Sequence, residues 1–180
     1  MYFHPFPTIK YDPTGSGYTN EIKDIMTRVA VKKWVRNTAA AFAVYGVPDG
    51  ATPDQVAFFL YDDTEYHWVV LMTNNITDRY YEWPMSQPQF QEFIEDKYGV
   101  ADIDAIHHYE ITTQSGRTSS NGPNDYSHLV ECNSDESGAV SVSNRGYEQR
   151  LQDKYRSIRL LSPKYLSQFV EEFENLIKGE

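Results

Sequence analysis

The segment from Tyr45 to Trp83 constrains the fold more strongly than any other part of the chain. Its first residues end the most apolar run in the sequence, 39–47, which we expect to form a strand. Asp49-Gly50 is a turn dipeptide. The next residues predict a helix start, because Thr52 can cap the helix and Gln55 can close a capping box. We expect that helix to bury three apolar side chains, Val56, Phe59 and Leu60.

A second helix is predicted to begin at Thr64, whose hydroxyl can accept a hydrogen bond from the amides of the first turn. Its apolar stripe would consist of Trp68, Leu71 and Met72. Asn74 and Asn75 tolerate the left-handed conformation that ends many helices. The segment therefore predicts a strand followed by two short helices that are joined by a tight turn.

This order of elements resembles a LysM module, a small strand-helix-helix-strand fold. The resemblance lies in Tyr45-Gly46-Val47 at the strand, Leu60-Tyr61 at the end of the first helix, and Trp68 followed by Asn74 in the second half. It implies that a set of residues forms the structural core, namely Tyr45, Gly50, Val56, Leu60, Tyr61, Trp68, Leu71 and Asn74.

The closing strand of a LysM module is missing from its usual place soon after the asparagine. The chain continues instead into Asp78-Arg-Tyr-Tyr-Glu-Trp-Pro84 and a further helix. We expect residues 158–161 to supply the closing strand by pairing with residues 42–47. The predicted fold class is α+β, a LysM-like core closed by a C-terminal strand, with added helices and an extended N-terminal arm.

Further motifs surround this core. They are Tyr2-Phe3…Phe6-Pro7-x-Ile9-x-Tyr11-Asp12, Asp24-Ile25-Met26-x-Arg28-Val29, Asp78-x-Tyr80-Tyr81-x-Trp83, Lys97-Tyr98-Gly99 and Arg156-x-Ile158-Arg159-Leu160-Leu161. Together they resemble the baseplate wedge subunit of T-even-type contractile-tailed phages, the gene-product-fifty-three family. The resemblance covers both ends and the middle of the chain, but not roughly residues 113 to 145.

The family resemblance implies a structural subunit of the virion and not an enzyme. Such a subunit would lie in the inner baseplate of the tail, bridge neighbouring wedges, and contact the wedge-core helical subunits and the small lysozyme-like adaptor below the sheath. It would assemble in the host cytoplasm. Candidate interaction residues are Phe3, Phe6, Ile9, Tyr11, Tyr80, Tyr81 and Trp83.

The N-terminal segment, residues 1–20, is predicted to be an extended arm, because its prolines and glycines oppose regular structure. Its four apolar side chains, Phe3, Phe6, Ile9 and Tyr11, require a partner. That partner is either the chain's own domain or a neighbouring subunit. After the arm, residues 22–29 show helical spacing and residues 29–35 alternate like a strand.

The remaining chain divides by composition into three parts. Residues 21–112 would hold the LysM-like core with its flanking elements, including a helix that begins at Ser86 and ends at Gly99 and a strand at 106–112. Residues 113–145 are a loop-rich insertion. Residues 146–180 contain a polar helix, the closing strand and a strongly amphipathic last helix, and they complete the core.

Charge and composition exclude several function classes. The net charge of −10 disfavours nucleic acid and anionic membrane surfaces as partners. No apolar run approaches the roughly 20 residues that span a bilayer. The start of the chain lacks the pattern of a signal peptide, and the single cysteine, Cys132, fits a reducing compartment.

No motif indicates catalysis, a cofactor or a metal. His107-His108 stands without Cys or acidic residues at a zinc spacing, and the two side chains are predicted to point to opposite faces of a strand. Phosphate loops, nucleophile elbows and calcium loops are missing from the sequence. The alternative function is a glycan-binding LysM-type module for peptidoglycan, although Ala51-Thr52 replaces the usual Asp-Thr pair and the chain departs from the pattern after Asn75.

Overall fold

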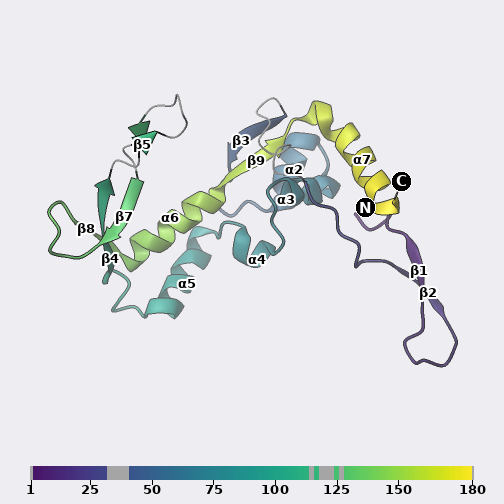
Figure 1. Ribbon diagram of the computed structural model, residues 1–180, viewed down its shortest axis with the longest axis horizontal. Helices are drawn as coiled ribbons and strands as arrows, with labels where there is room; N and C mark the ends of the chain where they lie inside the picture. Colours follow the sequence, from purple (N-terminus) through teal and green to yellow (C-terminus); the bar gives the residue numbers. More distant parts are fainter. Residues whose placement is uncertain (1, 32–40, 114–115, 118–123, 126–127, 180) are drawn as a thin grey trace. The chain divides into compact units, whose positions relative to one another are not determined.

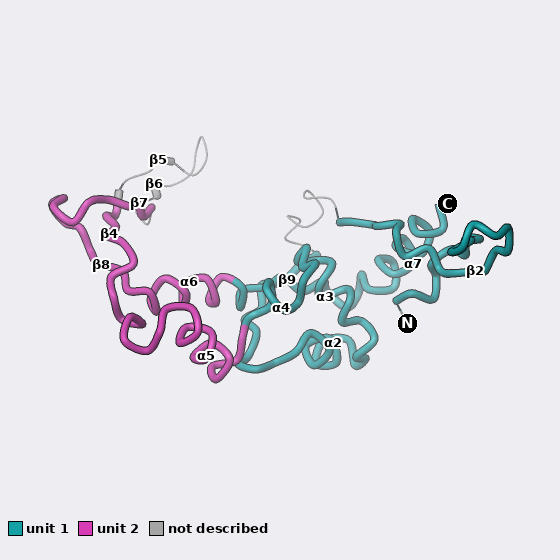
Figure 2. The backbone as a smooth tube through the Cα atoms, turned by 90° about the horizontal axis from the view of Figure 1, so that it is seen from below, with its two compact units in different colours: residues 1–84, 155–180 teal, residues 85–154 magenta. Residues whose placement is uncertain are grey.

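The computed structural model describes residues 2–31, 41–113, 116–117, 124–125 and 128–179 (Figure 1). Helices and small antiparallel sheets are mixed along the chain, which confirms the predicted α+β class. The chain forms two compact units (Figure 2). Unit 1 consists of residues 1–84 and 155–180, and unit 2 of residues 85–154. The structure thus groups residues 85–112 with the segment that follows them and not with the Tyr45–Trp83 segment.

The centre of unit 1 is a two-stranded antiparallel sheet of β3 (Phe42–Gly46) and β9 (Ser157–Leu161). Phe42 lies opposite Leu161, and Tyr45 lies opposite Ile158. This pairing of strands distant in sequence confirms the predicted closing strand. The sheet packs on α2 (Pro53–Tyr61) and α3 (His67–Thr73), which are joined by the 3-10 turn η1 (Thr64–Tyr66).

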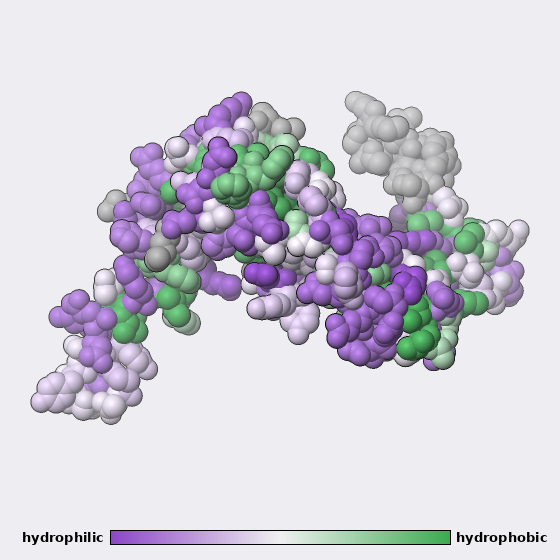
Figure 3. Space-filling model, turned by 180° about the vertical axis from the view of Figure 1, so that it is seen from behind, coloured by the Kyte–Doolittle hydropathy of each residue, from purple (hydrophilic) through white to green (hydrophobic). Residues whose placement is uncertain are grey.

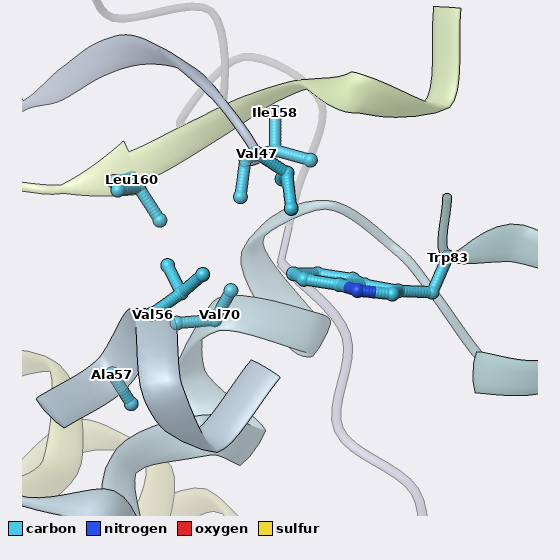
Figure 4. Close-up of a cluster of buried hydrophobic side chains, with 7 residues drawn as sticks. All are labelled: Val47, Val56, Ala57, Val70, Trp83, Ile158 and Leu160. Carbon is cyan, nitrogen blue, oxygen red and sulfur yellow. The ribbon is translucent and has the colours of Figure 1, made fainter. Parts of the chain in front are cut away.

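The core of this sheet and helix pair is a cluster of seven buried side chains (Figure 4). Those of β9 and of the residue that follows β3 face those of α2 and α3, and the Trp83 indole closes one side. The cluster consists of Val47, Val56, Ala57, Val70, Trp83, Ile158 and Leu160. Burial of branched aliphatic and aromatic surface at this density is the main stabilising contribution to such a core.

The start of α2 is the predicted capping box: Gln55 Oε1 accepts a hydrogen bond of 3.0 Å from the Thr52 backbone N–H. The buried face differs from the prediction. Phe59 is 74% exposed, whereas Ala57 is completely buried. The inward face follows Pro53, Val56, Ala57 and the half-buried Leu60, a spacing of three, one and three residues that turns Phe59 outward.

The second helical segment begins at Thr64 as predicted, but as the 3-10 turn η1 and with a different capping residue. Asp63, and not Thr64, accepts a hydrogen bond from the Glu65 N–H and caps η1. The fully buried residues of α3 are Val69, Val70 and Thr73. The predicted stripe of Trp68, Leu71 and Met72 is only half-buried.

Residues predicted as an extended arm and a helical turn form a β-hairpin. β1 (Thr8–Tyr11) pairs with β2 (Asn20–Lys23), so the prediction of helix from residue 22 was wrong. Pro7 and Pro13 flank β1 without interrupting it, so the two strands keep their backbone hydrogen bonds. The strand predicted at 29–35 lies largely outside the described residues, which stop at 31 on this side.

The last helix of the chain packs on the N-terminal residues within unit 1. A 3-10 turn, η2 (Pro163–Tyr165), leads into α7 (Leu166–Lys178), the strongly amphipathic helix predicted from the sequence. Phe173 and Ile177 on α7 bury themselves against Phe6. Tyr2, Val29, Trp68 and Met72 pack around this second cluster.

Unit 2 combines a three-stranded sheet with helical elements. The strand order is β7-β4-β8, from β7 (His128–Cys132), β4 (Ile106–Thr113) and β8 (Val140–Ser143), beside a short pair of β5 (Gly116–Arg117) and β6 (Asn124–Asp125). The helices are α5 (Gln87–Tyr98) and α6 (Asn144–Arg156), the latter reaching the first two residues of unit 1 beyond the boundary. A small apolar cluster of Phe90, Ile94 and Ile103 packs on α5, so the apolar side of that helix lies within unit 2.

Candidate interaction surface

The structure separates the N-terminal residues into a packed part and an exposed part. Phe6 is 3% exposed and lies against Phe173 and Ile177, so this predicted interaction residue belongs to the core of its own unit. The other three predicted arm residues, Phe3, Ile9 and Tyr11, are exposed by between 40 and 53%. On the face drawn in Figure 3, apolar side chains are exposed between stretches of polar surface.

The hairpin has two chemically different faces. Because residues directly opposite each other in an antiparallel pair lie on the same face, Ile9 and Ile22 share one face. Lys10 and Glu21, which are also paired, share the other. All residues of both strands are exposed, so neither face is covered by another described part of the chain.

The charged face is the one that ties the hairpin to the rest of unit 1. Lys23, at the end of β2, donates hydrogen bonds of 3.0 Å to the His4 carbonyl and 2.7 Å to the Phe6 carbonyl. The loop between the strands is held by Asp12, whose carboxylate accepts hydrogen bonds from the backbone N–H groups of Thr14 and Gly17. These hydrogen bonds, led by that of Gly17, lower the pKa of Asp12.

An apolar groove of about 840 Å³ lies beside the N-terminal residues in unit 1. Its apolar lining comes from the start of the chain, from the residues after β2 and from α3: Tyr2, Phe3, Phe6, Ile25, Val29, Trp68, Leu71, Met72 and Ile76. Arg28, Glu65 and His67 also line it.

The segment after α3 forms a single helical turn, α4 (Arg79–Glu82), that is fixed from both ends. Asp78 Oδ1 accepts a hydrogen bond of 2.8 Å from the Tyr80 N–H, and Glu82 Oε2 accepts one of 2.9 Å from the Asp78 N–H. Tyr80 and Tyr81 are 81% and 76% exposed.

Trp83, predicted as an interaction residue, lies instead in the core. It is 6% exposed, and its Nε1–H donates a hydrogen bond of 2.8 Å to the Ala51 carbonyl. The indole therefore anchors the α4 turn to the loop before α2. Tyr80 and Tyr81 are exposed while Trp83 is buried, because the backbone changes from helical to extended at Trp83.

The residues predicted as the structural core occupy different depths. Val56 is buried, and Tyr45, Leu60, Tyr61, Trp68, Leu71 and Asn74 are half-buried. Gly50 is exposed, with a φ of 69° that favours glycine in this turn. Trp68 lies in the second cluster, 4.6 Å from Phe173 between ring centroids, and not in the cluster between sheet and helices.

Tyr61 links α2 to β9, because its hydroxyl donates a hydrogen bond of 3.0 Å to the Leu161 carbonyl. Burial raises the pKa of the Tyr61 hydroxyl and so favours its neutral form, which donates the hydrogen bond.

Asn74 makes contacts that its local sequence did not predict. Its Oδ1 accepts a hydrogen bond of 2.8 Å from the Arg159 N–H, and its Nδ2 donates one of 2.8 Å to the Arg159 carbonyl. The side-chain amide thus takes the place of a neighbouring strand along the outer edge of β9. The left-handed residue at this helix end is Asn75, with a φ of 58°, and not Asn74.

Unit 2 contains two buried carboxylates that each have a cationic partner. Glu110 on β4 accepts hydrogen bonds of 2.7 and 2.8 Å from the Arg150 guanidinium, which holds the pKa of Glu110 below its usual range. Glu148 on α6 accepts hydrogen bonds from Lys97 and Tyr98 of α5, at 2.6 and 2.8 Å. Both are structural ion pairs within unit 2, and each joins α6 to another element.

The two adjacent histidines lie together, contrary to the prediction of opposite faces. An irregularity in the β4–β8 register between Ile106 and His108 allows the His107 and His108 Nδ1 atoms to approach within 2.8 Å. His107 stacks on the Tyr147 ring at 4.2 Å. Among the residues that the structure describes, no group of three or more His, Cys, Asp or Glu side chains is arranged to hold a metal ion.

The chain matches the phage family described as base plate wedge protein 53 over residues 1–121. The chain belongs to this base plate wedge family. A base plate wedge protein is a structural component of the phage tail, so the subunit is part of the virion, its role is structural, and its partners include other baseplate proteins.

The base plate wedge match includes the hairpin, the α4 turn and most of the Tyr45 core, but it stops before β9 and α7. No curated protein matches the chain. In the described part of this base plate wedge protein, no helix has the length and apolar character needed to cross a bilayer.

Proposed function

We propose that this subunit bridges neighbouring wedges of the inner baseplate, and that the apolar face of the β1–β2 hairpin makes the bridging contact. The observation that carries the proposal is the unpaired apolar face with Ile9, Tyr11 and Ile22, opposite a charged face that is tied to the subunit itself. An isolated two-stranded hairpin is marginally stable in water, so such an element gains order when a partner covers it.

Burial of this face would contribute to the energy of the association. Burial of apolar surface stabilises by about 25 cal/mol per Å², and three large side chains that are each roughly half exposed present on the order of 200 to 300 Å². Part of this gain offsets the cost of ordering the interface. Several copies that act together around a ring would strengthen the contact further, because each later contact is intramolecular.

The experiment compares two double substitutions on the same pair of strands. The double substitution of Ile9→Ser and Ile22→Ser removes the apolar face. The control, Lys10→Ser with Glu21→Ser, removes the neighbouring cross-strand pair, which lies on the opposite face. Each variant is mixed with the remaining wedge proteins of the phage, and ring closure is counted by electron microscopy. We expect the apolar-face variant to keep its melting temperature and form separate wedges, while the charged-face control closes rings.

Normal ring closure by the Ile9 and Ile22 variant would refute the bridging role of the hairpin. A large fall in its melting temperature would assign the face to the subunit's own fold. Truncation of the whole N-terminal segment is a poorer test, because it also removes Phe6 from the buried cluster with Phe173.

For the partners within the baseplate, we propose the wedge-core helical subunits and the lysozyme-like sheath adaptor, as the family resemblance implies, with assembly in the host cytoplasm. Pairwise binding of the purified proteins tests each contact separately. Binding that the variant with Ile9→Ser and Ile22→Ser retains would place that contact on a surface other than the hairpin, and absence of binding by the unaltered chain would refute that partner.

We also propose that β3, α2, α3 and β9 form a LysM-like core whose closing strand comes from far along the chain. The order strand, helix, helix and antiparallel strand supports it. In this core the Asn74 amide binds the edge of β9, which fits a structural use of the module. Retention of the protein on peptidoglycan would instead favour the glycan-binding function.

A further inference from the structure

The α4 turn presents two exposed aromatic side chains, and the Arg79 guanidinium already lies over one of them, 5.8 Å from the Tyr80 ring centroid. Tyr80 and Tyr81 are among the most exposed large side chains in the described residues. They project from a turn held by Asp78, Glu82 and the buried Trp83. Large apolar groups at a protein surface favour association and lower solubility. An exposed tyrosine pair on a well-anchored turn therefore indicates an interaction site.

The anchoring of this turn lowers the cost of binding. Glu82 Oε2 accepts hydrogen bonds from the backbone N–H groups of Thr77 and Asp78, at 2.6 and 2.9 Å, so the backbone is closed before any partner arrives. A tyrosine has only two side-chain torsions to fix. A preorganised tyrosine pair therefore loses little conformational entropy on binding and has the features of an interface hot spot.

The charges around the pair select the partner. Carboxylates of Asp78 and Glu82 lie on the same turn, and Asp54 at the start of α2 is close enough to Arg79 for that charge to act on it. Hydrogen bonds from the Asp78 and Thr77 backbone lower the pKa of Glu82. A hydrogen bond from the Thr52 side chain is the main cause that lowers the pKa of Asp54. Three carboxylates against one guanidinium leave the surroundings of the tyrosines acidic.

We infer that Tyr80 and Tyr81 form a docking site for a basic segment of another wedge protein, with arginine or lysine side chains stacked on the two rings. Cations prefer the faces of aromatic rings, and arginine does so most often. The acidic surroundings attract the same segment and repel anionic surfaces. The inference rests on membership of the wedge, and it holds whether or not the hairpin bridges wedges.

The test uses the full chain and a matched aromatic control. Tyr80→Ser with Tyr81→Ser is compared with Phe58→Ser with Phe59→Ser, because Phe58 and Phe59 are another adjacent, exposed aromatic pair in unit 1. Each protein is titrated with the other wedge proteins of the phage, purified one at a time, at low and high salt. We expect one of them to bind the unaltered chain, with binding weakened at least about tenfold by the tyrosine substitutions.

Salt and the control decide the chemistry of the contact. Binding of the unaltered chain should weaken as NaCl rises from about 50 mM to about 500 mM, since the Debye length falls over this range. The Phe58 and Phe59 control should bind as the unaltered chain does. Equal weakening by both variants, salt-independent binding, or a lowered melting temperature of the free tyrosine variant would each overturn the inference. Ring closure is not measured in this assay, so the outcome is independent of the bridging proposal.

Discussion

The Asn74 side chain determines how the end of α3 meets the sheet of unit 1. Its amide binds both the N–H and the carbonyl of Arg159, and Nδ2 also donates a hydrogen bond of 2.8 Å to the Val70 carbonyl. An unpaired strand edge invites association with other strands, and here one side chain covers part of it. The local sequence indicated only a helix end, because nothing near Asn74 identifies a partner that lies 85 residues away.

Replacement of this one side chain should therefore be destabilising. Asn74→Ala removes the two side-chain hydrogen bonds to the Arg159 N–H and carbonyl, and we expect unit 1 to lose about 1.5 to 3 kcal/mol. Asn75→Gly is the control, because it removes the neighbouring amide and suits the positive φ at that position. Urea unfolding followed by tryptophan fluorescence measures the effect, since all three tryptophans lie in residues 1–84. Equal stability of Asn74→Ala and Asn75→Gly would contradict this role.

The start of α2, the course of α7 and the β3–β9 pairing were predicted correctly, whereas the β1–β2 hairpin and the depth of the candidate interaction residues were not. The start of α2 and the course of α7 follow from capping residues and helical periodicity that adjacent residues carry. The β1–β2 hairpin was missed because its strands have four residues each and are flanked by prolines and glycines. The candidate interaction residues include exposed and buried side chains that the sequence did not distinguish. The exposure of Tyr80 and the burial of Trp83 depend on contacts that the motif does not specify.

The pairing of α7 with the N-terminal residues gives a prediction at this scale. Phe173→Ala removes a buried ring that contacts Tyr2, Phe6 and Trp68, and we expect a loss of about 3 to 5 kcal/mol in unit 1. Leu176→Ala on the same helix is the control, because that side chain is 53% exposed. Thermal unfolding by tryptophan fluorescence compares the two. A loss of less than about 1 kcal/mol for Phe173→Ala would mean that α7 does not hold the N-terminus.

At the scale of the whole molecule, unit 1 is discontinuous in sequence. Residues 85–154 form unit 2 between its two parts. The β3–β9 pairing could be predicted, because a strand-helix-helix segment without a closing strand must find one elsewhere. The boundary after Pro84 could not, because α5 carries the same kind of capping box and apolar stripe whichever unit it packs in.

Deletion of residues 157–180 tests this organisation. The truncated chain keeps all of α6 but loses β9 and α7, so unit 1 should unfold while unit 2 stays folded. We expect amide exchange to become fast at residues 42–73 and to remain slow in β4 and the first part of α6. Slow exchange at residues 42–47 in the truncated chain would show that β3 is stable without β9.

The late position of β9 has a consequence for synthesis on the ribosome. Gly46 and Ser157 are paired but are separated by 111 residues (157 − 46). At about 5 to 20 residues per second, β3 waits roughly 6 to 22 s for the strand that pairs with it, and α2 and α3 wait for somewhat less. During that interval the side chains of Val56 and Val70 lack the Ile158 and Leu160 surface that buries them. The first part of the chain to be translated is thus the last to acquire its native core, and a chain released from the ribosome before β9 is made has an unfolded unit 1.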